Sequence, residues 1–211
     1  MTDRVRLATV QLRGLLRGGA DVAASLGALD ADVVCVQGTP RWVRWRTRCA
    51  ALARRAGLVY VTGGGSASGT MLLCSPRAFV AHREDFPLPG IAQPAGRSLA
   101  IAVFSFTGGQ QLVVGSVRLG RAAGERLRHL DLIARRLVSL GRKYSAPYAL
   151  AGDLHEPAAG RAGATWPPCS PAAANRSRRV AGPASRAPPA SSPAPRSGPA
   201  QAPRRTVCGR P

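Results

Sequence analysis

The sequence lacks the features that would place it in a membrane or on a secretory route. No apolar run approaches the roughly 20 residues that a membrane-spanning helix requires. Asp3, Arg4 and Arg6 interrupt the start, and no apolar segment of a secretory signal follows them. We therefore expect a cytoplasmic protein with no membrane partner.

Cysteine is too scattered for a zinc site or a disulfide framework. The five cysteines form no C-x-x-C pair, and their number is odd. Cys35, Cys49 and Cys74 lie within apolar runs, so we expect reduced, buried thiols.

Lysine and acidic residues are also scarce. The 30 basic residues include one lysine, Lys143, and only ten acidic residues oppose them, which gives a net charge of +20. A positive surface would attract nucleic acid or phosphate. Arginine together with abundant alanine, glycine and proline is, however, also what GC-rich codons produce under weak constraint. Both interpretations of the basicity stay open at this point.

The composition changes abruptly after Glu156, where the last acidic residue stands. Residues 157–211 hold twelve of the 18 prolines and otherwise contain almost only Ala, Arg, Ser and Gly. No apolar residue repeats there with the period of a strand or a helix, so the segment has no face to bury, and we expect it to be disordered. It is either a basic tail that binds nucleic acid or the product of reading GC-rich DNA in a shifted frame.

Residues 4–156 alternate between strand and helix patterns. Helices are predicted over 21–29, 46–56 and 124–140, where apolar residues recur every three or four positions. Short apolar or alternating runs predict strands over 5–12, 33–36, 59–61, 70–74, 78–82, 98–106, 111–117 and 148–151. The mixture of hairpins and βαβ crossovers predicts an α/β sandwich.

Four motifs follow one another in a recognisable order. They are LATVQ over 7–11, ADVVCVQG over 31–38, VGSVRL over 114–119 and ALAGDLHE over 149–156. In this order and strand context they resemble the endonuclease/exonuclease/phosphatase superfamily, which has the deoxyribonuclease-I-like fold. The resemblance implies two stacked sheets wrapped by helices and hydrolysis of phosphodiesters or phosphomonoesters with Mg²⁺. It assigns residues 1–156 to the N-terminal part of such a domain, followed by the tail.

The polar residues of that family are only partly matched. The resemblance aligns Asp153 with the residue that polarises the attacking water, Gln11 and His155 with two asparagines, and Arg118 with a histidine. Gly38 stands where the family has its principal Mg²⁺-ligating glutamate, and no histidine follows His155 to supply the closing motif. Glycine offers no carboxylate to a hard cation. We therefore expect Mg²⁺, the cofactor of the family, not to be bound here.

Two functions remain open. The first is a phosphoesterase by descent, catalytically impaired, with Asp153 as its remaining catalytic group and Arg118 as its phosphate contact. The second is a pseudoenzyme that binds phosphate or nucleic acid through its arginine-rich surface. Asp153 and His155 form either an acid–base pair or a solvated pair in a loop.

Three further features have competing interpretations. The segment Arg41–Arg48 interleaves arginines with Trp42 and Trp45, which either stack on bases or cover the edge of a sheet. The glycine-rich run over 63–70 lacks the lysine of a phosphate-binding loop and predicts a hairpin connection. His129 falls on a predicted helix, and we expect it to be exposed and not part of a site.

The resemblance also implies that each half of a complete domain supplies one sheet. Residues 4–156 would then provide the first sheet and only the opening strand, 148–151, of the second. Several aliphatic side chains would lack cover: Val34, Val36, Leu72, Ile101, Val103 and Val113. Native domains keep a net stability of only ~5–15 kcal/mol, so we expect an aggregated or molten protein.

Overall fold

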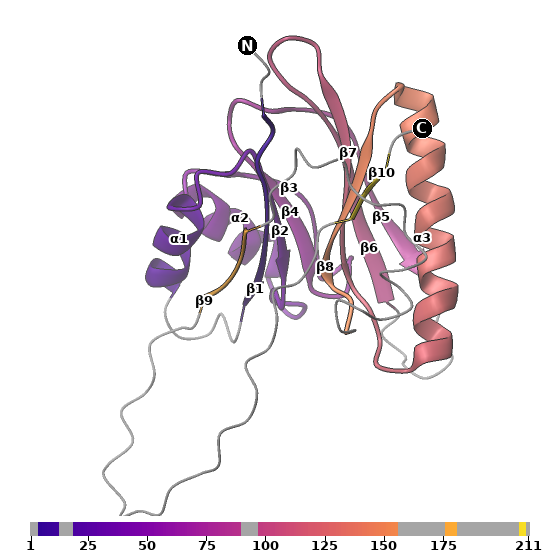
Figure 1. Cartoon of the computed structure of the whole chain (residues 1–211). Coiled ribbons are helices and arrows are strands. Elements are labelled where there is room, and N and C mark those ends of the chain that lie inside the picture. The colour runs from indigo at the N-terminus through magenta and orange to yellow at the C-terminus, as the bar shows by residue number, and fades with distance from the viewer. Residues whose placement is uncertain (1–3, 13–18, 90–96, 156–175, 181–206, 210–211) are drawn as a thin grey trace, which may run out of the picture.

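The computed structural model describes residues 4–12, 19–89 and 97–155, together with the backbone of two short segments, 176–180 and 207–209. Four layers follow one another across the molecule: a pair of helices, a first sheet, a second sheet and a third helix (Figure 1). The α/β sandwich predicted from the sequence is confirmed.

The first sheet has the strand order β3-β4-β2-β1-β9. Strands β1 and β2 are parallel neighbours connected through a helix, and β3 and β4 form a hairpin through the glycine-rich run, as predicted. The elements of this half are β1 (Leu7–Leu12), α1 (Gly19–Gly27), β2 (Val33–Gln37), α2 (Trp45–Arg55), β3 (Val59–Gly64) and β4 (Thr70–Cys74).

The second sheet has the order β10-β8-β7-β6-β5, and the longest helix covers its outer face. Strands β5, β6 and β7 form an antiparallel meander, and α3 then carries the chain to β8, which pairs in parallel with β7. The elements are β5 (Phe79–Leu88), β6 (Arg97–Ser105), β7 (Gln111–Arg118), α3 (Ala123–Tyr144) and β8 (Tyr148–Asp153). None of the helices in the described part of the chain is long and apolar enough to cross a membrane.

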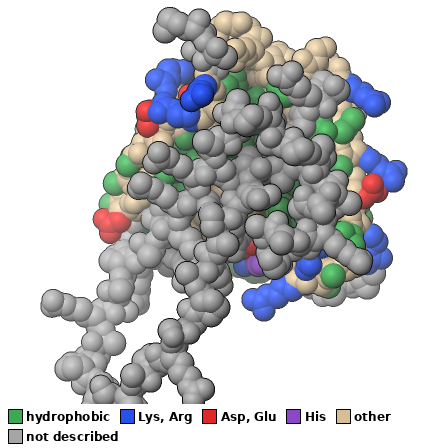
Figure 2. Space-filling model, in the orientation of Figure 1, with side chains coloured by type: hydrophobic (Ala, Val, Ile, Leu, Met, Phe, Trp, Pro, Cys, Tyr) green, Lys and Arg blue, Asp and Glu red, His purple; other side chains and the backbone are tan. Residues whose placement is uncertain are grey.

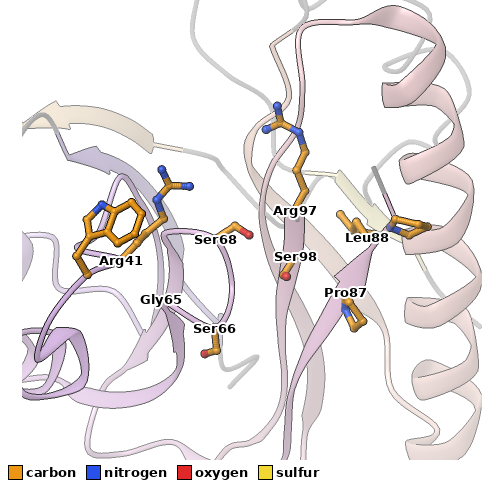
Figure 3. A pocket seen from close by; sticks show the side chains of 10 residues that line it. Arg41, Gly65, Ser66, Ser68, Pro87, Leu88, Arg97 and Ser98 are labelled. Carbon is orange, nitrogen blue, oxygen red and sulfur yellow. The ribbon is translucent and has the colours of Figure 1, made fainter. Parts of the chain in front are cut away.

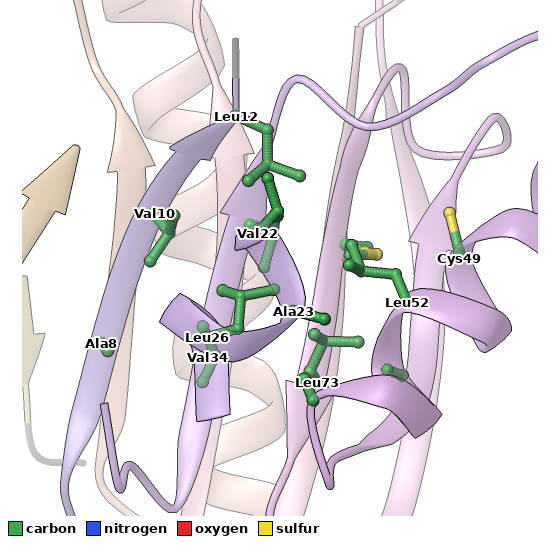
Figure 4. Packing of buried hydrophobic residues seen from close by; sticks show 14 of the residues in the cluster. Ala8, Val10, Leu12, Val22, Ala23, Leu26, Val34, Cys49, Leu52 and Leu73 are labelled. Atoms are coloured by element: carbon green, nitrogen blue, oxygen red, sulfur yellow. The ribbon is translucent and has the colours of Figure 1, made fainter. Parts of the chain in front are cut away.

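Apolar side chains fill all three spaces between the layers. Helices α1 and α2 pack on the first sheet, with Leu26 and Leu52 against Val10 and Leu73 (Figure 4). The space between the sheets is filled by a second cluster, which includes Cys35. A third cluster joins α3 to the second sheet through Leu130, Ile133, Leu137 and Leu140, which recur every three or four residues along one helix face.

The expectation of an uncovered sheet is wrong. Strands β5 to β8 build the second sheet within residues 79–153, so both sheets of the sandwich are present. The side chains expected to lack cover are all 0% exposed: Val34, Val36, Leu72, Ile101, Val103 and Val113. Strands were predicted over 78–82, 98–106 and 111–117 and are observed there, the first of them longer, but the expectation had assigned them to the first sheet.

Two short segments of the tail are in strands. The backbone of β9 (Arg176–Val180) pairs in parallel with β1, and β10 (Val207–Gly209) pairs antiparallel with β8. For these segments the structure differs from the expected disorder, because main-chain hydrogen bonds at an open sheet edge need no apolar periodicity. The rest of residues 157–211 lies outside the described part of the chain, and the expected disorder there stays a prediction.

Candidate functional site

Polar side chains gather between the two sheets at one end of the sandwich. Alternate residues of a strand face the same side, and on the side facing the other sheet the apolar residues give way to polar ones near the carboxyl ends of four strands. They are Thr9 and Gln11 on β1, Gln37 on β2, Ser116 and Arg118 on β7, and Asp153 on β8. Strands β1 and β2 are parallel to each other, as are β7 and β8, so the carboxyl ends within each pair coincide.

Gln37 joins the two sheets at this end. Its side-chain oxygen accepts a hydrogen bond from the Thr9 hydroxyl at 3.3 Å, and its Nε2 donates to the Ser116 hydroxyl at 3.3 Å. The side chain is buried, so these bonds satisfy an amide that would otherwise be costly to desolvate. Gln37 is thus a structural link between the sheets, a role that no local sequence pattern reveals.

Cys35 lies in the same interior layer, and Ser116 is also its hydrogen-bond partner. Burial raises the pKa of the Cys35 thiol to about 12, and the bond with Ser116 only partly opposes this. The thiol is therefore neutral at physiological pH and is not a nucleophile. The expectation of a free, buried thiol is confirmed for Cys35, Cys49 and Cys74.

Asp153, Arg118 and His155 form one cluster, which we call the Asp153 group. Asp153 is fully buried at the end of β8, and its Oδ1 lies 3.1 Å from Nδ1 of His155. The backbone N–H of His155 donates to the same oxygen at 3.2 Å, with His155 in the left-handed conformation at a φ of 50°. Nε of Arg118 lies 3.9 Å from Asp153 Oδ2, because the two residues are direct neighbours in the β7–β8 register.

The structure therefore brings together three of the residues that the resemblance singled out. His155 contacts Asp153 and its side chain is only 20% exposed, so the two are a held pair and not a solvated one. Gln11 lies on the neighbouring sheet, opposite Gln37 in the β1–β2 register and on the face toward the Asp153 group. The catalytic and phosphate-binding roles of these residues stay predictions.

Comparison with solved structures identifies the fold. The mannosyl-6-phosphatase of Bacteroides thetaiotaomicron superposes with a TM-score of 0.64 at 15% identity, over 75% of this chain and 68% of that chain. An endonuclease/exonuclease/phosphatase of Bacteroides vulgatus gives 0.63 at 16% identity, over 76% and 69%. The chain has the endonuclease/exonuclease/phosphatase fold. The sequence itself matches no family profile and no curated protein.

Another solved structure overlaps to a similar extent. Humanized TDP2 of D. rerio superposes with a TM-score of 0.56 at 20% identity, over 76% of this chain and 66% of that chain. The chain thus spans about two thirds of the length of these structures.

Gly38 stands where the resemblance implies a metal-ligating glutamate. It follows β2 directly and has a φ of 79°, which L-amino acids with side chains rarely adopt. A Cβ atom at this position would overlap the carbonyl oxygen of Leu12, at the end of β1. The backbone at the end of β2 therefore has room for glycine and not for the glutamate that the resemblance implies.

The described residues do not fit the Mg²⁺ ion that this fold implies. In the described part of the chain no group of three or more His, Cys, Asp and Glu side chains is arranged to hold a metal ion. The carboxylate of Asp153 lies between His155 and Arg118. The positive charge of Arg118 disfavours binding of a cation at this carboxylate.

The tryptophans of the segment Arg41–Arg48 behave differently from each other. Trp45 packs against the first sheet, and a Cβ at Gly64 would lie 2.5 Å from its ring, so this tryptophan covers the hairpin. Trp42 is 77% exposed. Trp45 thus covers the sheet, as one interpretation holds, and stacking of bases on Trp42 stays a prediction.

The expectation that His129 is exposed is wrong. It is 1% exposed, and its Nε2 lies 2.7 Å from the carbonyl oxygen of Pro89. The contact ties α3 to the end of β5, because His129 lies on the helix face that packs on the second sheet. The helix pattern alone did not reveal this, since a polar residue at the margin of an apolar face can point either way.

Proposed function

We propose that this chain binds phosphate esters at the Asp153 group and is impaired as a magnesium-dependent phosphoesterase. The impairment is inferred from the backbone at Gly38, which leaves no space for the carboxylate that would hold the metal. The neighbouring Arg118 supports the phosphate contact, since its side chain is 43% exposed and available to a ligand from solvent.

The Asp153 group has the chemistry of a small anion site. A guanidinium donates two parallel hydrogen bonds to phosphate oxygens. Asp153 contacts His155 from the loop after β8, and Arg118 from β7 lies beside its second oxygen, so two groups that can donate to phosphate flank one buried carboxylate. Such a carboxylate orients its partners and reduces the entropy that they lose when a ligand binds.

A second candidate is slow hydrolysis without a metal. If Nδ1 of His155 carries the proton toward Asp153, Nε2 is an acceptor that can take a proton from an attacking water. The 3.1 Å contact between Nδ1 and Asp153 favours this arrangement. Asp153 then fixes the tautomer of His155, and Arg118 stabilises the negative charge on the phosphoryl oxygens.

Binding and hydrolysis are tested separately. Calorimetry with inorganic phosphate should give measurable binding that Arg118→Gln abolishes. Arg121→Gln, which removes an exposed charge three residues away, should bind phosphate almost as well as the original chain. Equal losses in both variants would show that phosphate responds only to the overall charge, and the proposed site would be wrong.

Hydrolysis of bis(p-nitrophenyl) phosphate and p-nitrophenyl phosphate is then followed with Mg²⁺ and with EDTA. We expect no stimulation by Mg²⁺, because the described residues supply no metal cluster. Residual hydrolysis in EDTA that is lost in His155→Gln would support the metal-free candidate. Strong stimulation by Mg²⁺, lost in Asp153→Asn, would contradict the proposed impairment.

We also propose a cytoplasmic location, which the free thiols of Cys35, Cys49 and Cys74 support. The overall basicity is not a specific binding surface in this proposal. Figure 2 shows Lys and Arg side chains around the periphery of the face that it presents.

A further inference from the structure

Strands β3 and β5 form one lateral side of the sandwich. Among the described strands each is the outermost of its sheet, so β3 pairs only with β4 and β5 only with β6. At the end that holds the Asp153 group, a pocket of about 560 Å³ lies between the β3–β4 turn and the start of β6 (Figure 3). At the other end, a pocket of about 500 Å³ lies between the first residues of β3 and of β5, and we call it the edge groove. Its lining residues are Val59–Val61 and Val80–Arg83.

A polar bridge closes the sandwich between these two pockets. Nη1 of Arg83 on β5 donates to the carbonyl oxygen of Val61 on β3 at 3.1 Å, and the Thr62 hydroxyl donates to Oδ1 of Asp85 at 3.0 Å. Pro87 follows on β5 and has no N–H to offer at a sheet edge. Charges that point inward and a proline are features that keep an edge strand from pairing with another chain. The second part of β5 is therefore a protected edge.

The first part of β5 lacks this protection. The β5–β6 register shifts between Val80 and His82, so a bulge separates the start of the strand from the bridged part. Val80 is 39% exposed in the groove, and Val59 on the facing strand is 44% exposed. Phe79 is 72% exposed, and the alternation of a strand directs it to the opposite face from Val80. Apolar side chains exposed together in this way mark a contact surface for another molecule.

The charges beside the edge groove are positive. Arg83 lines the groove and forms no ion pair with a carboxylate in the described part of the chain. Nζ of Lys143 lies 5.4 Å from the ring centre of Tyr144, whose ring is in turn 6.0 Å from the ring of His82 in the groove. Lys143 likewise has no ion-pair partner among the described carboxylates.

The two carboxylates of β5 are engaged elsewhere. Glu84 accepts hydrogen bonds from two nitrogens of the Arg136 guanidinium, which neutralises its charge. Asp85 accepts from Thr62 and Ser66, beyond the polar bridge. Neither carboxylate lines the edge groove. An apolar surface with a positive rim is complementary to a partner that carries both apolar and acidic side chains.

We propose that the edge groove binds an extended acidic segment of a partner protein, which adds a strand to the start of β5. An added strand uses the main chain of an open sheet edge for hydrogen bonds. Its side chains alternate between the two faces, so successive apolar residues would pack against Val80 and Phe79 while acidic ones approach Arg83 and Lys143. This binding does not depend on the proposed function of the Asp153 group, which lies at the opposite end of β5.

Charge argues against the two occupants that the protein itself could supply. Residues 157–211 contain no Asp or Glu, so the tail offers no acidic segment to the positive rim. A second copy has the same net charge of +20 and brings the same positive rim to the groove. The partner is therefore a different, acidic chain.

Fluorescence anisotropy with the full chain and the labelled hexapeptide EVEFEV tests the proposal. The peptide ESESES has the same charge without apolar side chains, and we expect it to bind weaker by about ten-fold or more. EVEFEV with an N-methyl group on every residue keeps the side chains and the charge but has no main-chain N–H, and it should lose affinity to a similar extent. Binding of ESESES or of the methylated peptide as tight as that of EVEFEV would overturn the proposal.

Variants of the chain locate the binding surface. Phe79→Ser and Val80→Ser should each weaken binding of EVEFEV by about five-fold or more. Val43→Ser removes a valine that is 79% exposed and lies outside the groove, and it should change the affinity little. Hydrogen exchange of the amides over 79–82 should slow when the peptide is bound. An equal loss in Val43→Ser would overturn the proposal, as would a dimer in light scattering that Phe79→Ser abolishes, because a second copy would then occupy the groove.

Discussion

Replacement of Gly38 should destabilise the protein even though the position lies at a strand end. A residue other than glycine at its φ of 79° costs about 1–2 kcal/mol. The added Cβ would also overlap the carbonyl oxygen of Leu12, and overpacking of this kind costs a further ~1–3 kcal/mol. We therefore expect Gly38→Ala to lower the free energy of unfolding by about 2–5 kcal/mol, measured by urea denaturation followed by circular dichroism.

Gly109 provides the control that separates the two costs. Its φ is 78°, and an added Cβ would meet no atom within 4 Å. Gly109→Ala should therefore show only the conformational cost of about 1–2 kcal/mol. Gly38→Glu should be at least as unstable as Gly38→Ala and should gain no Mg²⁺ affinity in calorimetry. Equal stability of the two alanine variants, or a stable Gly38→Glu chain that binds Mg²⁺ below millimolar concentration, would refute the reasoning.

Two further predictions concern titration. The hydrogen bonds from Arg136 lower the pKa of Glu84, so the stability from this pair is present above the unfolded pKa of glutamate and is lost as the pH falls through the lower, folded pKa. Arg136→Gln should lower the free energy of unfolding by about 1–2 kcal/mol at pH 7 and by less near pH 3. Arg135→Gln should lower it little, because the pair of Arg135 with Asp131 is exposed. A loss of stability in Arg136→Gln that does not change with pH would contradict this. Burial raises the pKa of Cys35 to about 12 and the pKa values of Cys49 and Cys74 to about 11. These thiols should therefore resist alkylation at pH 8 until urea unfolds the chain, which peptide mass spectrometry can measure. Rapid labelling of Cys35 in the native protein would contradict its burial.

The elements of the fold could be predicted because their apolar periodicity is local. The run VVCV over 33–36 and the helix over 124–140 both match observed elements closely. Strand β5 is longer than predicted, Phe79–Leu88 instead of 78–82. Its second part contains Arg83, Glu84 and Asp85, which lie at the sheet edge and make polar contacts, so no apolar alternation marks them.

The assignment of strands to sheets could not be predicted from such local patterns. Pairing depends on contacts between residues far apart in sequence, such as Gln37 with Ser116, and a strand pattern reads the same in either sheet. The expected collapse into a molten state rested on one such assignment. With both sheets present and their facing residues buried, a cooperative unfolding transition is now expected.

The sequence could predict more about the residues of the Asp153 group than about the backbone at Gly38. The resemblance singled out Asp153 and Arg118 separately, and the structure brings them together because they are partners in the parallel β7–β8 register. Gly38 could be read as a missing carboxylate, but the sequence could not show that the backbone has closed around the glycine. A side chain lost at an unchanged backbone can be restored by one substitution. Here β1 and β2 would have to move apart first, so return of the glutamate alone does not rebuild the metal site.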